Sequence, residues 1–436
     1  MLKISIIGAG SMEFSKEIMT DVLLSPELEQ GTFALVDVDN NRLELAHQMA
    51  EYLIKLTGRD WNVEASTDRN RVIENSDFVI NTIEVAGLPN VRHDYEIPLK
   101  YGIDQCIGDT IGPGGLFKSL RTLPSWVQIL KDVENLAPRA VVMNYTNPMS
   151  LTVLTGLRAS KLQIIGLCHS IQHTLEQISF YLNIPSKKLI YEVAGINHLA
   201  FFTKLEYQGE DMYPLLREKA RTLEIYEQDP VRFEMMLHLG YFSTEGSGHA
   251  SEYTAYFRKR PDLVKKYDRG GYLGESGFYA NNWPEWRNAA DDETRRILAG
   301  EKKVDLKRGP EYASYIIESM KTGHPITIYG NVINENWIDN LPKDGIVEVA
   351  CEVDSEGIQP IHYGKLPTQL ALLNQQHMAF HDLAATAILM QDREAAIHAL
   401  MCDPLTSAVC SLEEIRKLFN DMVKAEKEYL PEFLYE

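Results

Sequence analysis

The sequence predicts an α/β protein, with a doubly wound parallel sheet in the N-terminal part and a mixed α+β, mostly helical part after it. Up to about residue 187, short apolar runs alternate with amphipathic helical stretches, which is the rhythm of parallel strands joined by helical crossovers. Beyond that point a partly alternating apolar stretch gives way to mainly helical sequence. We therefore expect two domains, residues 1–187 and residues 188–436.

The elements of the first expected domain can be placed in order. An apolar strand opens the chain, and a helix follows its glycine-containing turn. Asn40 is placed to cap the amphipathic helix after the second strand. Helical stretches, including residues 119–136, separate the later strands. The five predicted strands are residues 2–7, 33–39, 77–83, 140–146 and 163–169.

The second expected domain begins with β-structure and ends with helices. Residues 189–207 are expected to be rich in strands, and residues 346–354 (IVEVACEVD) form another strand-like run. We expect ordered loops over residues 330–342. Residues 261–276 are expected to be a mobile loop, because glycine and charged residues are frequent there. Residues 366–390 predict one long buried helix.

The overall charge narrows the classes of partner. The formal net charge of −19 argues against nucleic acid or an anionic membrane, because both are polyanions. No run approaches the ~20 apolar residues that a membrane-spanning helix needs. The first residues do not have the pattern of a secretion signal, so we expect a cytoplasmic protein. The five cysteines are an odd number and widely spaced, which does not fit a disulfide framework.

The first turn of the chain has features of a dinucleotide-binding site. Gly8 and Gly10 stand between a strand and a helix, where glycines let a pyrophosphate approach the free N–H groups of the helix. Ser11 follows them and can cap that helix or bind a phosphate. Glu13 replaces the third glycine of the usual G-x-G-x-x-G pattern. These features predict a Rossmann-like domain, and the alternative is a sharp turn without a ligand.

An acidic residue at the end of the second predicted strand suits the adenosine ribose. The Asp37 carboxylate can bind the ribose hydroxyls and would repel a 2′-phosphate, so the sequence favours NAD over NADP. Asp39 is the second choice for this role. The alternative is that Asp37 only caps the next helix.

Polar residues follow several predicted strands, at the edge where open α/β sheets place their ligands. A thiolate and an imidazole from different strands, Cys168 and His198, can hold one divalent ion and leave positions open for substrate hydroxyls. His173 is an alternative ligand, and the cysteine or the histidine could instead be an ordinary buried residue. The polar residues at this edge are Asp109, Asn144, Asn147, Cys168, His169, Asn197 and His198.

Seven short motifs follow one another along the chain: IIGAGS, GDTIGPGG, NYTNP, GLCHS, AGINH, EYTAYF and IDNLP. No single motif is specific, but their combination and order resemble glycoside hydrolase family 4, and most of all its α-galactosidase branch. The resemblance covers the chain from Ile4 to about Pro367. It implies an enzyme that uses NAD and a divalent metal ion, often Mn2+, and acts on a small-molecule sugar.

The resemblance implies cleavage by temporary oxidation of the sugar. NAD takes a hydride from C3, and a metal ion on Cys168 and His198 binds the oxygens at C2 and C3. Tyr253 in EYTAYF then removes the C2 proton, with Tyr256 as the second candidate. The leaving group departs by elimination, water adds at C1 and the hydride returns, so NAD is not consumed.

Two residues, His169 and Asp109, are candidates for the acid that protonates the leaving group. His169 stands where phosphosugar relatives carry an aspartate, so that assignment does not transfer directly. Asn147 and Asn197 are expected to bind sugar hydroxyls. The tripeptide Cys-His-Ser resembles the α-galactosidase branch, and an α-glucoside or an α-galacturonide is the alternative substrate.

Two other functions fit part of the sequence. A 2-hydroxyacid dehydrogenase would also begin with a strand–glycine–helix turn, but it would leave Cys168 and His169 without a role. A redox-sensing NAD-binding protein would show no metal-dependent turnover. We also expect a homodimer or homotetramer, since the long apolar C-terminal helix can form a subunit contact. Metal binding is expected to be weak, because manganese prefers oxygen ligands to thiolate.

Overall fold

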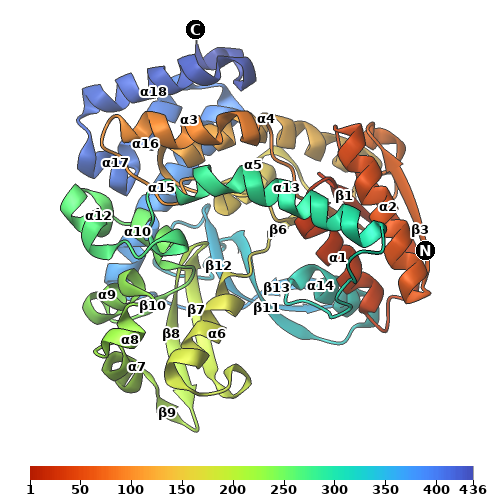
Figure 1. Cartoon of the computed structure of the whole chain (residues 1–436), viewed down its shortest axis with the longest axis horizontal. Coiled ribbons are helices and arrows are strands. Elements are labelled where there is room, and N and C mark those ends of the chain that lie inside the picture. Colours follow the sequence, from red (N-terminus) through yellow and green to blue (C-terminus); the bar gives the residue numbers. More distant parts are fainter. Residues whose placement is uncertain (436) are drawn as a thin grey trace.

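The structure, a computed structural model, describes residues 1–435. Its strands belong to one continuous sheet with helices on both faces (Figure 1). In chain order the strands are β1 (Leu2–Ile7), β2 (Gln30–Val36), β3 (Asp60–Ser66), β4 (Phe78–Asn81), β5 (Val141–Asn144), β6 (Gln163–Gly166), β7 (Ile190–Ile196), β8 (Leu199–Tyr207), β9 (Glu210–Asp211), β10 (Phe242–Ser243), β11 (Ile326–Ile333), β12 (Ile346–Asp354) and β13 (Gly357–Pro360).

The helices fall into two groups along the chain. The N-terminal group is α1 (Met12–Leu24), α2 (Asn40–Thr57), α3 (Gly87–Leu99), α4 (Gly112–Leu136), α5 (Met149–Ala159) and α6 (Ser170–Leu182). The later group is α7 (Tyr213–Lys219), α8 (Leu223–Tyr226), α9 (Pro230–Leu239), α10 (Ser247–Glu252), α11 (Ala255–Arg258), α12 (Pro261–Tyr267), α13 (Phe278–Leu298), α14 (Tyr312–Thr322), α15 (Thr368–Met390), α16 (Arg393–Cys402), α17 (Pro404–Val409) and α18 (Leu412–Glu426).

Six strands form the parallel part of the sheet, in the order β3-β2-β1-β4-β5-β6. This is the strand order of doubly wound dinucleotide-binding folds, and the predicted fold class is confirmed. In the centre, Ile4 of β1 pairs with Phe33 on one side and Phe78 on the other, and all three side chains are buried. Burial on both faces explains why these strands appear in the sequence as short apolar runs.

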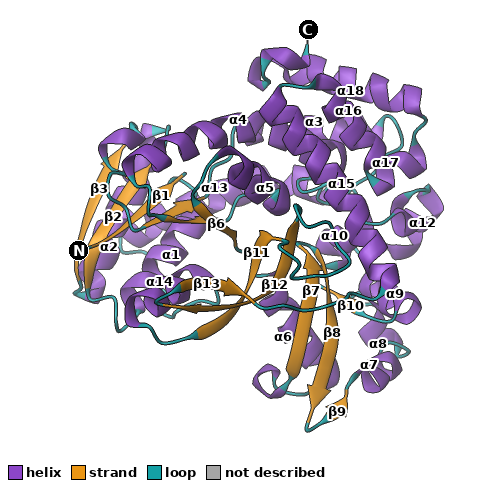
Figure 2. Cartoon of the chain, turned by 180° about the vertical axis from the view of Figure 1, so that it is seen from behind, coloured by secondary structure: helices purple, strands orange, loops and turns teal. Residues whose placement is uncertain are grey.

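The antiparallel strands continue the sheet beyond β6. Strand β11 meets β6 through the pair Asn331 and Gly166, and β12 meets β7 through Glu348 and Gly195. Figure 2 shows the β7–β8 hairpin extending away from the parallel strands. A second apolar cluster packs between this hairpin and helices α6, α7 and α9. Within residues 1–435, no helix has the length and apolarity that crossing a membrane requires.

Several expectations need correction. Asp39, not Asn40, is the N-cap residue of α2. Residues 261–276 were expected to be a loop but contain α12, and residues 330–342 begin with the last part of β11. Strand β3 was not predicted, since it lies at the sheet edge and most of its side chains reach solvent. By contrast, β1, β12 and the long helix α15 lie where the sequence predicts them.

Candidate active site

The turn after β1 has the backbone that dinucleotide binding requires. Gly8 has a φ of +88°, and a Cβ atom there would lie 2.7 Å from the carbonyl carbon of Thr82, so only glycine fits. Ser11 is the N-cap residue of α1, and its side chain makes no capping hydrogen bond within the described residues. The N–H groups of this helix end, together with the Ser11 hydroxyl, therefore suit an anionic group.

Asp37 lies next to this turn, directly after β2. Its carboxylate accepts hydrogen bonds from the N–H groups of Gly10 (2.8 Å) and Asp39 (2.9 Å). Asp39 caps α2 by accepting from the N–H of Asn41 at 2.9 Å. The helix cap is thus Asp39, which leaves Asp37 as the carboxylate next to the glycine turn.

Helix α13 runs across the part of the molecule that carries the glycine turn (Figure 1). Asp291 of α13 forms an ion pair with Arg42 of α2 at 2.7 Å, and the Arg42 Nε donates to the carbonyl of Gly10 at 3.0 Å. A second ion pair joins Glu293 of α13 to Lys16 of α1 at 2.8 Å. A segment more than 200 residues away in the chain therefore contacts both helices that flank the glycine turn.

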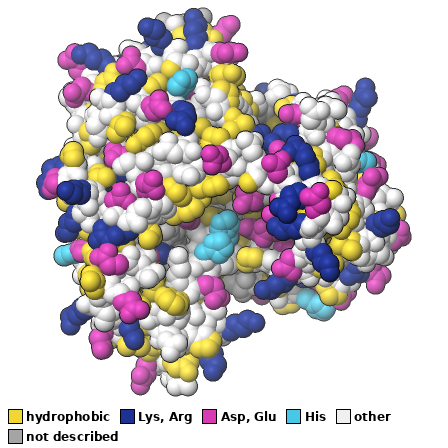
Figure 3. Space-filling model, in the orientation of Figure 1, with side chains coloured by type: hydrophobic (Ala, Val, Ile, Leu, Met, Phe, Trp, Pro, Cys, Tyr) yellow, Lys and Arg dark blue, Asp and Glu magenta, His cyan; other side chains and the backbone are white. Residues whose placement is uncertain are grey.

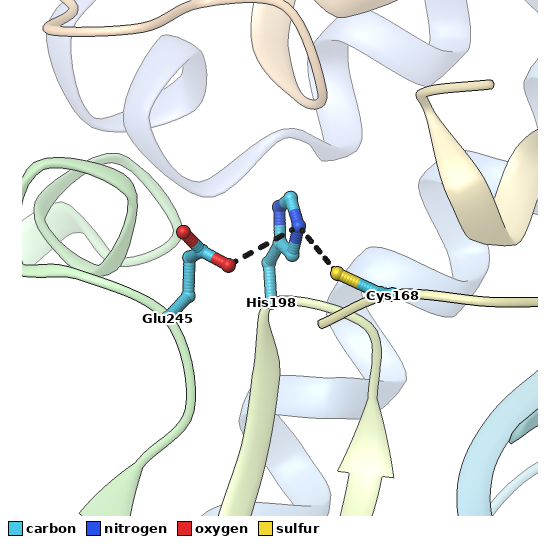
Figure 4. Close-up of side chains that lie close together, drawn as sticks. All are labelled: Cys168, His198 and Glu245. Carbon is cyan, nitrogen blue, oxygen red and sulfur yellow. Dashed lines mark hydrogen bonds and ion pairs between the residues drawn. The ribbon is translucent and has the colours of Figure 1, made fainter. Parts of the chain in front are cut away.

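Three side chains of types that can bind a metal ion meet near the carboxyl end of β6 (Figure 4). Cys168 follows β6, His198 lies in the turn between β7 and β8, and Glu245 follows β10. The Cys168 Sγ is 3.6 Å from the His198 Nε2, which is 3.5 Å from the Glu245 Oε2. All three donor atoms lie within 4.8 Å of one another. A thiolate, an imidazole and a carboxylate at these distances fit one divalent ion.

Burial controls the charges of this cluster. It raises the pKa of the Cys168 thiol to about 11, so a nearby cation is needed to favour the thiolate that binds metal. Burial would also raise the pKa of Glu245, but His198 and His249 outweigh it and lower that pKa to about 2. The cluster thus offers an ionised carboxylate beside a thiol that a metal ion can deprotonate.

A row of polar side chains continues from the cluster toward the dinucleotide turn. The His249 Nδ1 is 3.4 Å from the Glu245 Oε1, and the His249 Nε2 is 4.0 Å from the Asp109 Oδ1. The Lys118 ammonium lies 2.9 Å from Asp109 and 3.5 Å from Glu84, which follows β4. Burial alone would raise the pKa of Asp109, but Lys118 and His249 hold it below its usual value. Asp109 is therefore a carboxylate in this arrangement.

Tyr253 is buried near His198. It is the C-cap residue of α10, is only 3% exposed, and its ring centroid is 6.1 Å from that of His198. Burial raises the pKa of its phenol well above the usual value, so positive charge nearby is needed to stabilise a phenolate. Tyr256 is 52% exposed on α11. Tyr253 is therefore buried near the cluster, whereas Tyr256 faces solvent.

The neighbouring Glu252 holds the segment before Asp109. Its carboxylate accepts hydrogen bonds from the N–H groups of Ile107 at 2.5 Å and Gly108 at 3.0 Å. Only the first part of the GDTIGPGG motif is a loop, because α4 already begins at Gly112. Through Glu252, the segment that carries Asp109 and the helix that carries Tyr253 are joined.

His169 projects from the same strand end as Cys168 but has a different partner. Its Nδ1 lies 2.7 Å from the Oε1 of the buried Glu311, at the N-terminus of α14. Burial would lower the pKa of His169, but the hydrogen bond to Glu311 outweighs it and raises the pKa to about 10. The ring of His173 lies 4.5 Å from that of His169, and His173 is not among the three side chains of the metal cluster.

The asparagines at this edge differ in their surroundings. Asn144 accepts from the amide of Asn81 at 2.8 Å and donates to the carbonyl of Thr146 at 2.9 Å, so it stabilises the strand ends. The Oδ1 of Asn147 is buried and has no hydrogen-bond partner within residues 1–435. Asn197 is buried directly before His198. Asn147 and Asn197 are therefore better placed than Asn144 to bind a ligand.

Figure 3 shows a hollow in this face of the molecule, with histidine side chains exposed beside it. The structure brings together Cys168 and His198, as predicted, and adds Glu245, His249 and Glu311, which the sequence analysis missed. The available signal was in TEGSGH, where a glutamate and a histidine stand four residues apart, as on one face of a helix.

Two family models match the chain along most of its length. The model described as "Family 4 glycosyl hydrolase" matches residues 3–184, and the "Family 4 glycosyl hydrolase C-terminal domain" matches residues 193–406. The chain is 37% identical to an alpha-galactosidase of Bacillus subtilis (strain 168), over 99% of this chain and 100% of that protein. It is 34% identical to an alpha-galactosidase of Rhizobium meliloti (strain 1021), over 99% and 90%. An alpha-galacturonidase of Lachnoclostridium phytofermentans is 28% identical, over 99% and 97%.

Solved structures show the same architecture. The putative glucosidase lplD of Bacillus subtilis superposes with a TM-score of 0.86 and 26% identity, over 97% of this chain and 99% of that one. A 6-phospho-alpha-glucosidase from gut microorganisms, in complex with NAD and Mn2+, superposes with a TM-score of 0.82 and 21% identity, over 99% of both chains. The second similarity is one of fold.

Proposed function

The chain belongs to family 4 of the glycosyl hydrolases, and on that premise we propose that it hydrolyses α-galactosides with NAD and a divalent metal ion as cofactors. The observation that carries the proposal is the cluster of Cys168 and His198 at the carboxyl edge of a sheet that also holds a dinucleotide turn. The full-length similarity to two alpha-galactosidases supports the choice of substrate. A 2-hydroxyacid dehydrogenase would leave this cluster unexplained.

We assign the two cofactors to separate groups of residues. Gly8, Gly10, Ser11 and Asp37 surround the turn that suits NAD, and Cys168 and His198 supply two ligands for a metal ion such as Mn2+. When bound, NAD would take a hydride from C3 of the sugar and later return it, while the metal ion would polarise the oxygens at C2 and C3.

In this proposal Tyr253 moves the C2 proton. Oxidation at C3 makes the hydrogen on C2 acidic, and we assign the role of accepting this proton to the buried phenol of Tyr253, whose ring lies 6.1 Å from that of His198. A phenol of usual pKa ~10 needs a nearby cation to act near neutral pH. A divalent metal ion held by Cys168 and His198 would supply this positive charge. Elimination then releases the leaving group from C1.

We propose His169 as the acid that protonates the leaving oxygen. Glu311 holds the Nδ1 side of the ring at 2.7 Å, which leaves the Nε2–H to donate. Asp109 is the weaker candidate, because its ion pair with Lys118 at 2.9 Å stabilises the carboxylate rather than the acid. We propose that Asn147 and Asn197 bind sugar hydroxyls, because both amides are near the cluster segments and Asn147 has an unpaired buried oxygen.

The test is hydrolysis of p-nitrophenyl α-galactoside, with NAD, Mn2+ and reductant each omitted in turn. We expect activity to require all three, because the thiol of Cys168 must stay reduced to bind metal. No net NADH should accumulate, since the hydride returns to the sugar.

Other outcomes separate the alternatives. Hydrolysis of α-galacturonides or α-glucosides, without hydrolysis of the galactoside, would keep the mechanism and change the substrate. Full activity in strong chelator would contradict the metal assignment. Stoichiometric NADH formation with a hydroxyacid would support the dehydrogenase instead.

A further inference from the structure

We propose that Glu245 is a third protein ligand of the metal ion and that its oxygen makes the site favour manganese over softer metals. This inference rests on the proposed function, which assigns the ion to Cys168 and His198. It answers a chemical question that those two residues leave open, because a thiolate and an imidazole alone would suit soft or borderline metals better than manganese.

The distances among the three side chains match a shared ion. Ligand atoms bound about 2.0–2.3 Å from one ion lie roughly 3–4 Å from their neighbours. The His198 Nε2 is 3.6 Å from the Cys168 Sγ and 3.5 Å from the Glu245 Oε2. The third separation is below 4.8 Å, so small side-chain rotations can bring all three atoms into one coordination sphere.

The backbone supports a functional role for Glu245. It has a φ of +67°, and His198 has a φ of +63°, both in the left-handed region that residues with a Cβ rarely adopt. Such a conformation costs free energy and persists where the surrounding structure or function requires it. Two of the three side chains in the cluster are therefore presented by turns of the same unusual conformation.

The second oxygen of Glu245 has a partner that fixes the carboxylate. The Oε1 lies 3.4 Å from the Nδ1 of His249, while the Oε2 faces His198. Carboxylate ligands of metal ions are commonly oriented by an outer polar partner, and this contact leaves the other oxygen of Glu245 for the ion. The Nε2 of His249 in turn lies 4.0 Å from the Oδ1 of Asp109. His249 therefore contacts the Glu245 oxygen that is not offered to the metal ion.

Charge also favours this arrangement. A thiolate and a carboxylate together supply two negative charges, which neutralise a divalent ion in a site where His198 is almost fully buried. The carboxylate oxygen is the donor type that manganese prefers, whereas thiolate attracts softer ions. Removing Glu245 should therefore weaken manganese binding more than binding of a soft ion such as Cd2+.

The experiment measures metal affinity of the metal-free protein rather than activity. Binding of Mn2+ is followed by the electron paramagnetic resonance signal of the free ion, and Cd2+ by its competition with Mn2+. We expect Glu245→Ala to raise the Kd for Mn2+ at least about tenfold, since loss of even an outer partner of a ligand costs about 10–100-fold. The Kd for Cd2+ should rise less. Asp292→Asn removes an exposed carboxylate outside the cluster and should leave both values unchanged.

Two variants make the result decisive. Thermal unfolding of the metal-free proteins checks that Glu245→Ala folds. If that variant does not fold, Glu245→Gln takes its place, because glutamine keeps the shape of the side chain. Wild-type affinity for Mn2+ in both Glu245 variants, together with a loss in Cys168→Ser, would overturn this inference and leave the proposed function intact. Wild-type affinity in Cys168→Ser as well would overturn the metal assignment itself. Equal losses for Mn2+ and Cd2+ would overturn the metal preference.

Discussion

Asp109 and Glu311 are both carboxylates close to a histidine, but their other partners give them different chemistry. Asp109 forms an ion pair with Lys118 at 2.9 Å. This pair helps to hold the pKa of the Asp109 carboxyl below its usual value, although burial acts in the opposite direction. Glu311 lies 2.7 Å from the Nδ1 of His169. We therefore expect Asp109 to act through its negative charge and Glu311 to act by orienting the His169 ring.

Replacing Tyr253 with phenylalanine should lower kcat by at least about 100-fold, because a general base contributes about 10²–10⁴-fold. NAD binding, measured by equilibrium titration, should not change, since the glycine turn belongs to a different segment. Tyr256→Phe is the matched control: its side chain is 52% exposed, and the variant should keep the wild-type rate. A nearly wild-type kcat for Tyr253→Phe would assign the base to another residue.

Some site residues could be predicted from the sequence and others could not, because only some of them lie at the ends of recognisable strands. Cys168 could be predicted because it lies just beyond the end of a buried parallel strand, β6 (Gln163–Gly166), and His198 because it follows another strand-like run. Glu245 and His249 follow β10, a strand of two residues whose pairing with β8 depends on the folded structure. Glu311 comes from the start of α14, and its pairing with His169 spans 142 residues. The spacing of Glu245 and His249 suggests a shared face, but no local pattern predicts which distant residues they contact.

At the scale of elements, α13 contacts the two helices beside the dinucleotide turn. Asp291→Asn should remove the partly buried ion pair with Arg42, worth about 1 kcal/mol, and should raise the Kd for NAD about fivefold. The rate at saturating NAD should stay unchanged. The neighbouring Asp292→Asn removes only an exposed pair with Arg295 and should have no effect on NAD binding. Equal Kd values for the wild type and Asp291→Asn would show that α13 does not influence the cofactor.

Helix α15 makes the protein sensitive to acid through two buried histidines, His377 and His381. Burial lowers the pKa of His377 to about 4 and that of His381 to about 3. The unfolded chain, with a histidine pKa of ~6.5, binds protons that the folded chain excludes, so stability falls as pH drops below 6.5.

The test compares the free energy of unfolding at pH 6.5 and pH 5. His381 alone should account for a loss of up to about 2 kcal/mol over that interval, because each pKa unit corresponds to about 1.4 kcal/mol. In His381→Gln this part of the loss should disappear, while the exposed His238→Gln should keep the wild-type slope. Identical slopes in wild type and His381→Gln would contradict the assignment.

Buried strands could be predicted from the sequence, whereas exposed strands could not. Strands such as β1 and β12 are mostly buried and rich in apolar residues, so their composition was enough to predict them. The edge strand β3 is largely polar and exposed, and only its parallel pairing with β2 defines it. The second half of β11 was expected to be loop; Gly330 and Asn331 interrupt its apolar pattern. Their place in the strand depends on contacts with β6 and β12.

At the scale of the whole molecule, a buried ion pair network joins the C-terminal helix α18 to the N-terminal part. Arg121 of α4 contacts Asp94 of α3 at 2.7 Å and also contacts Glu426 of α18, and the Arg121 side chain is fully buried. Removing one partner of such a network leaves uncompensated buried charge, which costs about 3–5 kcal/mol.

Arg121→Met should therefore lower the free energy of unfolding by about 3–5 kcal/mol, measured by urea denaturation. Arg416→Met on α18 removes a half-exposed pair with Glu394 and should cost less than about 1 kcal/mol. A cost for Arg121→Met as small as that for Arg416→Met would mean that the network does not hold α18 in place.

The position of α13 has a consequence for how the enzyme depends on its surroundings. Two ion pairs fasten this helix to α1 and α2 beside the glycine turn. A dinucleotide enclosed there would leave slowly, and a reaction that returns its own hydride gives it no need to leave. The coenzyme would then behave as a prosthetic group that is recharged in every cycle. Sugar cleavage would proceed at the same rate whether the surrounding nicotinamide pool is oxidised or reduced.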